Sequence, residues 1–250
     1  MAPLLLLALD LAAIALFVWL GVRIYQTIGP ALWAARGRHD RARRLYDRMA
    51  HKGLFASTRR VGSYGVAICD LQLGRFEEAL RALTALDREG PPPELQLGVD
   101  VAIGTALLQL DRDMEEARDR FERASHRLRQ PDVLLGLAHA ELAIGNEERA
   151  LELADEAAQM PATATTTFGR HALLRRSGRM VEHSTDFLLG WFLTKVGRDE
   201  EAAPLLEEVS RWPVRSWLTD KAQTLLAAMD LPPAEVTEEP PSTAAVVIDR

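Results

Sequence analysis

The stretch LQLGRFEEALRAL, residues 71–83, joins a glycine-containing break to the start of an amphipathic helix. Three later stretches follow the same plan: LDRDMEEARDRF (110–121), AIGNEERALELA (143–154) and KVGRDEEAAPLL (195–206). In each, a glycine or polar residue ends one helix, acidic residues open the next, and an alanine follows. Glycine adopts the positive φ that terminates many helices, and acidic side chains stabilise the free N–H groups of a helix start. The sequence therefore predicts a series of helical hairpins.

The spacing of these stretches indicates a repeat. Aligned on Ala79, Ala117, Ala150 and Ala202, the copies lie 38, 33 and 52 residues apart, and a fainter copy, ARGRHDRARRLYDRM (35–49), places Ala42 another 37 residues upstream. Periods in this range are typical of stacked supersecondary units. Apolar residues recur at helical spacing after each alanine, and residues 61–230 contain no alternating strand pattern. We therefore predict an all-α fold in which the small residue lets two helices approach closely.

The chain resembles the tetratricopeptide repeat family over about residues 30–230. The resemblance rests on LGRFEEAL (73–80), GNEERAL (145–151), LG (189–190) with GRDEEA (197–202), and Pro131, Pro161 and Pro213. The repeats are divergent, because the family's first-helix tryptophan is missing and its first-helix glycine is clear only at Gly190. The resemblance implies a solenoid of helical hairpins whose concave face, lined by the first helices, binds an extended peptide or a partner's helix.

The 52-residue interval between Ala150 and Ala202 leaves two ways of pairing its helices into hairpins open. In one, LLRRSGRMVEHS (173–184) forms a degenerate hairpin turn and GRDEEA falls between hairpins. In the other, an extra helix precedes the last repeat. Both versions are all-helical.

The N-terminal segment predicts a membrane anchor. APLLLLALDLAAIALFVWLGV (2–22) carries one charge, Asp10. As a helix, about 20 residues span about 30 Å, the thickness of a bilayer's hydrocarbon core. A cleavable signal peptide would need basic residues before the apolar run and a small-residue cleavage site after it, and neither is present. We predict a single transmembrane helix over 2–25, in which Asp10 either contacts a partner helix or is drawn towards the headgroups.

Basic residues follow this segment. Residues 23–60 hold ten Lys or Arg against two Asp, whereas the remainder is acidic and the chain carries a net charge of −6. The positive-inside rule then places the N-terminus outside and the repeats in the cytoplasm, at the inner (plasma) membrane. Arginine outnumbers lysine 27 to 3, which indicates a GC-rich, bacterial genome. The basic residues are also expected to attract anionic lipid headgroups, whereas the acidic body argues against nucleic-acid binding. The juxtamembrane basic residues are Arg36, Arg38, Arg41, Arg43, Arg44 and Arg48.

The remaining chain divides into a basic segment with a partial first repeat (26–56), the tetratricopeptide-like repeats (57–230) and a Pro/Glu-rich tail expected to be disordered (231–250). No phosphate-binding loop or HExxH motif is present, the histidines are scattered, and Cys69 is the single cysteine. We therefore expect no catalytic, cofactor or metal site. The candidate groove residues on the predicted first helices are Ser63, Tyr64, Asp70, Gln109, His139 and Glu141.

These features predict a membrane-anchored adaptor that holds a peptide or partner protein and is not an enzyme. Two alternatives stay open. One is a bacterial envelope-assembly factor that regulates a membrane enzyme, although the members with that role carry a cysteine-rich metal module that this chain lacks. The other is an enzyme built on a helical scaffold.

Overall fold

A computed structural model of the chain describes residues 29–160, 172–214 and 216–229, with backbone alone for residues 172–182. These ranges contain helices and turns and no strand, which confirms the all-α prediction. Residues 29–35 are helical and lead into ten further helices. Their bounds are α2 His39–Lys52, α3 Ala56–Gln72, α4 Phe76–Arg88, α5 Pro93–Gln109, α6 Met114–Arg127, α7 Pro131–Ala143, α8 Glu147–Gln159, α9 Ala172–Lys195, α10 Asp199–Ser210 and α11 Trp217–Ala228.

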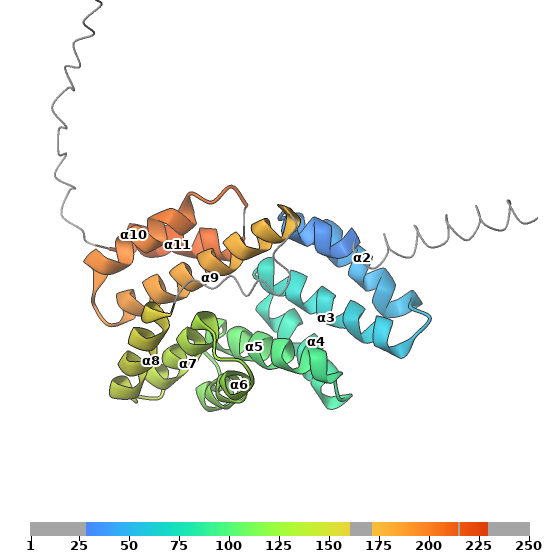
Figure 1. The fold of residues 1–250 in the computed structure, drawn as a ribbon, viewed down its shortest axis with the longest axis horizontal. Coiled ribbons are helices and arrows are strands. Elements are labelled where there is room, and N and C mark those ends of the chain that lie inside the picture. The colour runs from blue at the N-terminus through green and yellow to red at the C-terminus, as the bar shows by residue number, and fades with distance from the viewer. Residues whose placement is uncertain (1–28, 161–171, 215, 230–250) are drawn as a thin grey trace, which may run out of the picture.

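The helices pair as consecutive antiparallel hairpins: α3 with α4, α5 with α6, α7 with α8, and α9 with α10. The first helices also contact one another along the series, α3 with α5, α5 with α7, and α7 with α9. Figure 1 shows the resulting arc, which runs from α2 through α4 to α8 and on to α10, while the long α9 crosses its open side in this view. This arrangement is a repeat array of the solenoid kind, with the first helices on the inner side.

The repeated alanines explain how the two helices of a hairpin pack. Each is the fourth residue of a second helix and has no exposed surface: Ala42, Ala79, Ala117, Ala150 and Ala202. In the four hairpins from α3 to α10, the residue twelve positions before this alanine lies on the first helix and is also small. These residues are Ala67, Thr105, Ala138 and Gly190. A Cβ atom added at Gly190 would lie 3.4 Å from the carbonyl oxygen of Ala202, so small residues on both sides allow this approach. The predicted role of the alanine is thereby confirmed.

The turns between paired helices also follow the sequence prediction. The turn glycines have positive φ, namely Gly37, Gly74, Gly145 and Gly197. The α5–α6 turn has no glycine, and there Asp111 and Asp113 adopt φ values of 51° and 43°. Oδ1 of Asp113 accepts a hydrogen bond from the N–H of Glu116 at 3.2 Å, which caps α6. The side-chain cap thus accompanies a backbone conformation that glycine would adopt more easily.

The long interval before Ala202 contains one long helix, α9. The hairpin turn at 173–184 was one of the two alternatives for this interval. α9 continues without a break through residues 173–184, so that turn is not formed. GRDEEA lies inside the α9–α10 hairpin, because Gly197 forms its turn and Asp199 begins α10. Ser177 and Gly178 do not stop the helix; its C-terminal half is held by packing of Phe187 and Phe192, which are fully buried.

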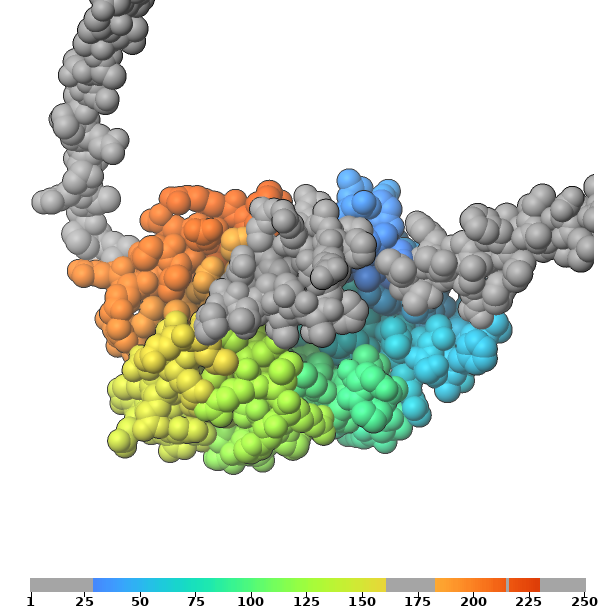
Figure 2. Space-filling model, viewed as in Figure 1, coloured from blue at the N-terminus to red at the C-terminus, as the bar shows by residue number. Residues whose placement is uncertain are grey.

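Buried side chains form two clusters. The larger joins α3 to α8 and includes Phe121 and Leu134, while the smaller joins α9, α10 and α11 around Phe187 and Leu206. Figure 2 shows the same arc in space-filling form, with successive repeats in contact along it. Within the described ranges, no helix is long and apolar enough to cross a bilayer. The predicted span 2–25, with Asp10, and the tail 231–250 lie outside those ranges and stay predictions.

Candidate functional site

The last helix returns to the beginning of the repeat array. α11 contacts both α9 and α3. The ring of Trp217 packs edge-on against Phe76 of α4, with centroids 5.3 Å apart, and against Phe187 of α9, with centroids 5.2 Å apart. Val214 reaches the turn before α2, where a Cβ atom at Gly37 would lie 2.3 Å from its Cγ1 atom. The concave side is therefore partly closed by the chain's own C-terminal helix, whereas the sequence predicted an open groove.

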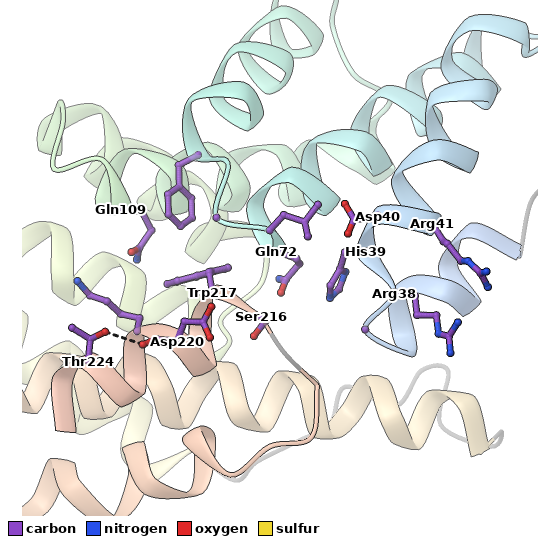
Figure 3. Close-up of a pocket in the computed structure, with 15 residues that line it drawn as sticks. Arg38, His39, Asp40, Arg41, Gln72, Gln109, Ser216, Trp217, Asp220 and Thr224 are labelled. Carbon is purple, nitrogen blue, oxygen red and sulfur yellow. Dashed lines mark hydrogen bonds between the residues drawn. The ribbon is translucent and has the colours of Figure 1, made fainter. Parts of the chain in front are cut away.

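This closure leaves a cleft of about 820 Å³ between α2, the α3–α4 turn and α11. Figure 3 shows His39, Gln72 and Trp217 directed towards the space between them, and Arg38 and Arg41 directed away from it. Its apolar lining includes Leu73, Phe76 and Trp217, and its polar lining comprises Arg38, His39, Asp40, Arg41, Gln72, Gln109, Ser216, Asp220, Lys221 and Thr224. We call this space the α2–α11 cleft.

A second cavity of about 330 Å³ lies on the inner side of the array. Its walls come from the first helices α3, α5, α7 and α9 together with α11, and most of them are apolar. Gln72, Gln109 and Trp217 line both spaces. Trp217 thus stands between the α2–α11 cleft and this inner cavity.

Polar atoms of His39 and Gln109 in the α2–α11 cleft lack hydrogen-bond partners among the described residues. The two ring nitrogens of His39 make no hydrogen bond, and the Nε2 atom of Gln109 makes none either. His39 is 3% exposed, and burial lowers the pKa of its imidazole, which keeps the ring neutral at pH 7. A neutral imidazole carries one donor and one acceptor, and a carboxamide carries both as well. A buried polar group without a partner lowers the stability of the fold. A polar ligand that reached these groups and formed hydrogen bonds with them would recover that loss.

The inner cavity has a second polar group of this kind besides Gln109. Oδ1 of Asp132, near the start of α7, has no hydrogen-bond partner among the described residues. Burial raises the pKa of its carboxyl group, against the opposing effect of backbone hydrogen bonds from Val133 and Asp132 itself. A carboxyl held in an apolar wall favours its protonated form, which can donate a hydrogen bond.

The structure brings two of the six sequence-predicted groove residues to these spaces. Tyr64 lines the inner cavity and Gln109 lines both. Ser63 is half-buried on α3 and lines neither. Glu141 accepts a hydrogen bond from Nδ2 of Asn146 at 2.7 Å in the α7–α8 turn.

The other two predicted residues are buried and engaged within the protein. Oδ1 of Asp70 accepts from Nε of Arg43 at 2.7 Å and from Nη1 of Arg75 at 3.4 Å. His139 is fully buried between α7 and α9, where its Nε2 atom lies 2.9 Å from the carbonyl oxygen of Leu188 and its ring centroid lies 4.2 Å from that of Trp191. Burial lowers the pKa of His139 to about 3. These contacts stabilise the packing of neighbouring helices.

His39 is one of several cleft residues, with Gln72 and Trp217 among them, that the sequence did not single out. It begins α2 within a run of arginines, and nothing in that run distinguishes it from an exposed histidine. Ser216 and Trp217, which are distant in sequence, line the same cleft, and Val214 reaches the neighbouring Gly37. No local pattern could have indicated that contact.

The juxtamembrane basic residues adopt three different environments. Arg43 turns inward to Asp70, as described above. Arg36, Arg38 and Arg41 surround the ring of Trp33, with guanidinium carbons 4.9–5.7 Å from its centroid. Arg44 and Arg48 are exposed on α2. Five of the six basic residues therefore lie outside the Arg43–Asp70 pair, around Trp33 or exposed on α2.

The described residues show no arrangement typical of a catalytic centre. His39 makes no hydrogen bond to Ser216, although both line the α2–α11 cleft. Cys69 is 1% exposed, and burial raises the pKa of its thiol to about 12. Within the described ranges no cluster of three or more His, Cys, Asp or Glu side chains is placed to hold a metal ion. The chemistry that these spaces offer is binding through hydrogen bonds and an aromatic face.

Comparisons with known proteins identify no relative of this chain. No family model matches the chain, and it has no significant match among curated proteins or solved structures.

Proposed function

We propose that this protein is a membrane-anchored adaptor of the tetratricopeptide kind, which binds an extended segment of a partner protein in the α2–α11 cleft. The observation that carries the proposal is the cleft itself, a space of about 820 Å³ with unpartnered polar groups around the face of Trp217. Its size falls within the range of about 300–1,000 Å³ that is common for ligand sites.

The lining favours a peptide over a small charged metabolite. A peptide backbone presents N–H and C=O groups in alternation, and the side chains of His39, Gln72 and Gln109 each offer both a donor and an acceptor. Trp217 and Phe76 offer an apolar surface for one side chain of such a peptide. Arg38 and Arg41 point away from the space, and the remaining charged residues of the lining, Lys221 with Asp40 and Asp220, are of both signs.

The predicted anchor completes the proposal. With the N-terminus outside and the repeats in the cytoplasm of a bacterial cell, residues 2–25 would confine the cleft to the inner membrane surface. Confinement raises the effective concentration of the cleft towards membrane-bound partners without any further contact. Such a protein would act as a scaffold and would carry out no reaction of its own.

Site-directed photocrosslinking tests the proposal. Benzoylphenylalanine is placed in intact cells at Gln72 or Thr224 in the cleft, and as a control at Glu122, an exposed residue on α6. We expect the two cleft positions to capture the same protein and the control position not to capture it. A synthetic segment of that protein should then bind the purified chain, and Gln109→Ala should weaken this binding at least threefold. Equal capture from Glu122, or binding that is insensitive to Gln109, would refute the proposed site.

A further inference from the structure

The turn between α2 and α3 exposes apolar side chains. Leu54 is 74% exposed and Phe55 is 61% exposed, the highest values for large hydrophobic residues among the described ones. Val61, on the first turns of α3, is 37% exposed. We call these three residues the α2–α3 tip. Figure 2 shows the light-blue residues around this turn at the outer edge of the molecule.

Basic side chains line the helix that leads to this tip. Arg41, Arg44, Arg48 and Lys52 are exposed on α2, and their spacing of three or four residues places them on one face of the helix. We call this set the α2 basic stripe. It ends two residues before Leu54, so a row of positive charge runs directly into an exposed apolar turn.

The acidic residues of α2 lie off this stripe and are paired. Each precedes a stripe residue by one position, which turns it about 100° around the helix. Asp40 lies 3.7 Å from a guanidinium nitrogen of Arg75, and Asp47 lies 3.4 Å from the ring of His51. Asp40 lies four residues before Arg44 and Asp47 three residues after it, so Arg44 borders both carboxylates, whereas Arg41, Arg48 and Lys52 lie farther round the helix from them.

We propose that α2 lies along an anionic membrane surface, with the α2 basic stripe against the headgroups and the α2–α3 tip inserted at the boundary with the acyl chains. Peripheral helices bind membranes by this combination of burying apolar side chains and attracting anionic lipid. The docked surface holds α2, and with it one wall of the α2–α11 cleft, in a fixed orientation to the bilayer.

The size and charge of the surface favour a membrane over a protein partner. Stable protein interfaces bury at least about 1,000 Å², and the apolar part here consists of three side chains. Insertion into a bilayer requires no matching partner surface, and an anionic leaflet complements a stripe of one sign. The tip also belongs to the first hairpin after the predicted span. The inference does not depend on whether a peptide occupies the cleft, so each can fail alone.

The single cysteine allows a direct test in the full-length chain. Cys69 is buried and its thiol pKa is raised, so it should not react with a maleimide, and the F55C variant can be labelled at residue 55 with an environment-sensitive fluorophore. The matched control is L128C, in the α6–α7 turn, which replaces another exposed leucine between arginines. Both proteins are placed in nanodiscs of phosphatidylcholine with or without phosphatidylglycerol.

We expect the label at residue 55 to shift to the blue and to gain at least twofold in emission with phosphatidylglycerol, and to be quenched by spin-labelled acyl chains. The label at residue 128 should change in neither respect. The charge variant R44Q/R48Q/K52Q should abolish the gain at residue 55. A variant with the same loss of charge elsewhere, R81Q/R112Q/R149Q, should preserve it, because these three arginines are exposed on other parts of the array.

Three results would overturn the proposal. The first is an unchanged label at residue 55 in anionic nanodiscs. The second is an equal change with phosphatidylcholine alone. The third is a change that appears in detergent as protein concentration rises, which would make the tip a contact between two copies of the chain.

Discussion

Trp217→Ala tests whether the last helix holds the first hairpins in place. Trp217 makes two edge-on aromatic contacts, with Phe76 and with Phe187. Each such pair stabilises the fold by about 0.5–1.5 kcal/mol beyond the effect of its buried area. Loss of half the burial of a large aromatic side chain costs about 1–2 kcal/mol more. We therefore expect the free energy of unfolding to fall by about 3 kcal/mol. For a domain of this size that corresponds to a melting temperature lower by about 6–12 °C.

The decisive measurement is where the loss appears. Hydrogen exchange followed by mass spectrometry should show faster exchange in α3, α4, α9 and α11 of the Trp217→Ala protein, because Trp217 packs against Phe76 of α4 and Phe187 of α9 and its helix contacts α3. Trp212→Ala provides the control: this tryptophan is half-buried too, but its ring packs on His183 of α9, with centroids 4.7 Å apart. It should accelerate exchange in α9 and α10 only. Unchanged exchange in α3 and α4 of the Trp217→Ala protein would refute the closure of the array.

Three further perturbations have defined outcomes. His139 is neutral in the fold with a pKa of about 3, whereas an unfolded histidine titrates near 6.5, so its stabilising contribution is complete above pH 6.5 and is lost as the pH falls towards 3. The free energy of unfolding, measured with urea, should fall by about 2 kcal/mol between pH 7 and pH 5 because of this residue. His139→Leu should remove that part of the pH dependence. Gly62→Ala should destabilise the protein by about 1–3 kcal/mol in spite of its higher helix propensity, because the new Cβ atom would lie 2.4 Å from the backbone nitrogen of Ala50; a thermal melt above that of the parent would contradict this. Asp100 is 1% exposed and accepts hydrogen bonds from three arginines of α6, so Asp100→Ala should cost about 2 kcal/mol in urea unfolding, while Asp119→Ala, at an exposed site, should change stability by less than about 0.5 kcal/mol.

The local features of the fold could be predicted from the sequence because short-range physics determines them. The alanine at the fourth position of each second helix, the turn glycines and the acidic first turns depend on neighbouring residues alone. The predicted turn at 173–184 was one of two alternatives and does not form, since burial of Phe187 and Phe192 outweighs the low helix propensity of Ser177 and Gly178.

The site could be predicted only in part. Tyr64 and Gln109 were found because first helices line the inner side of any such array. The pairing of Trp217 with Phe76, which closes the cleft that His39 lines, depends on the curvature accumulated over four hairpins. Small rotations between successive repeats determine that curvature, and no single stretch of sequence encodes it.

The return of α11 to α3 also constrains how this architecture can change over evolution. An open solenoid can gain or lose a unit by duplication or deletion, because each unit touches only its neighbours. Here an inserted or deleted hairpin would separate Trp217 from Phe76 and leave both rings facing water. The number of hairpins between those two rings is therefore held constant by the contact between them, and variation is free to enter only in the turns.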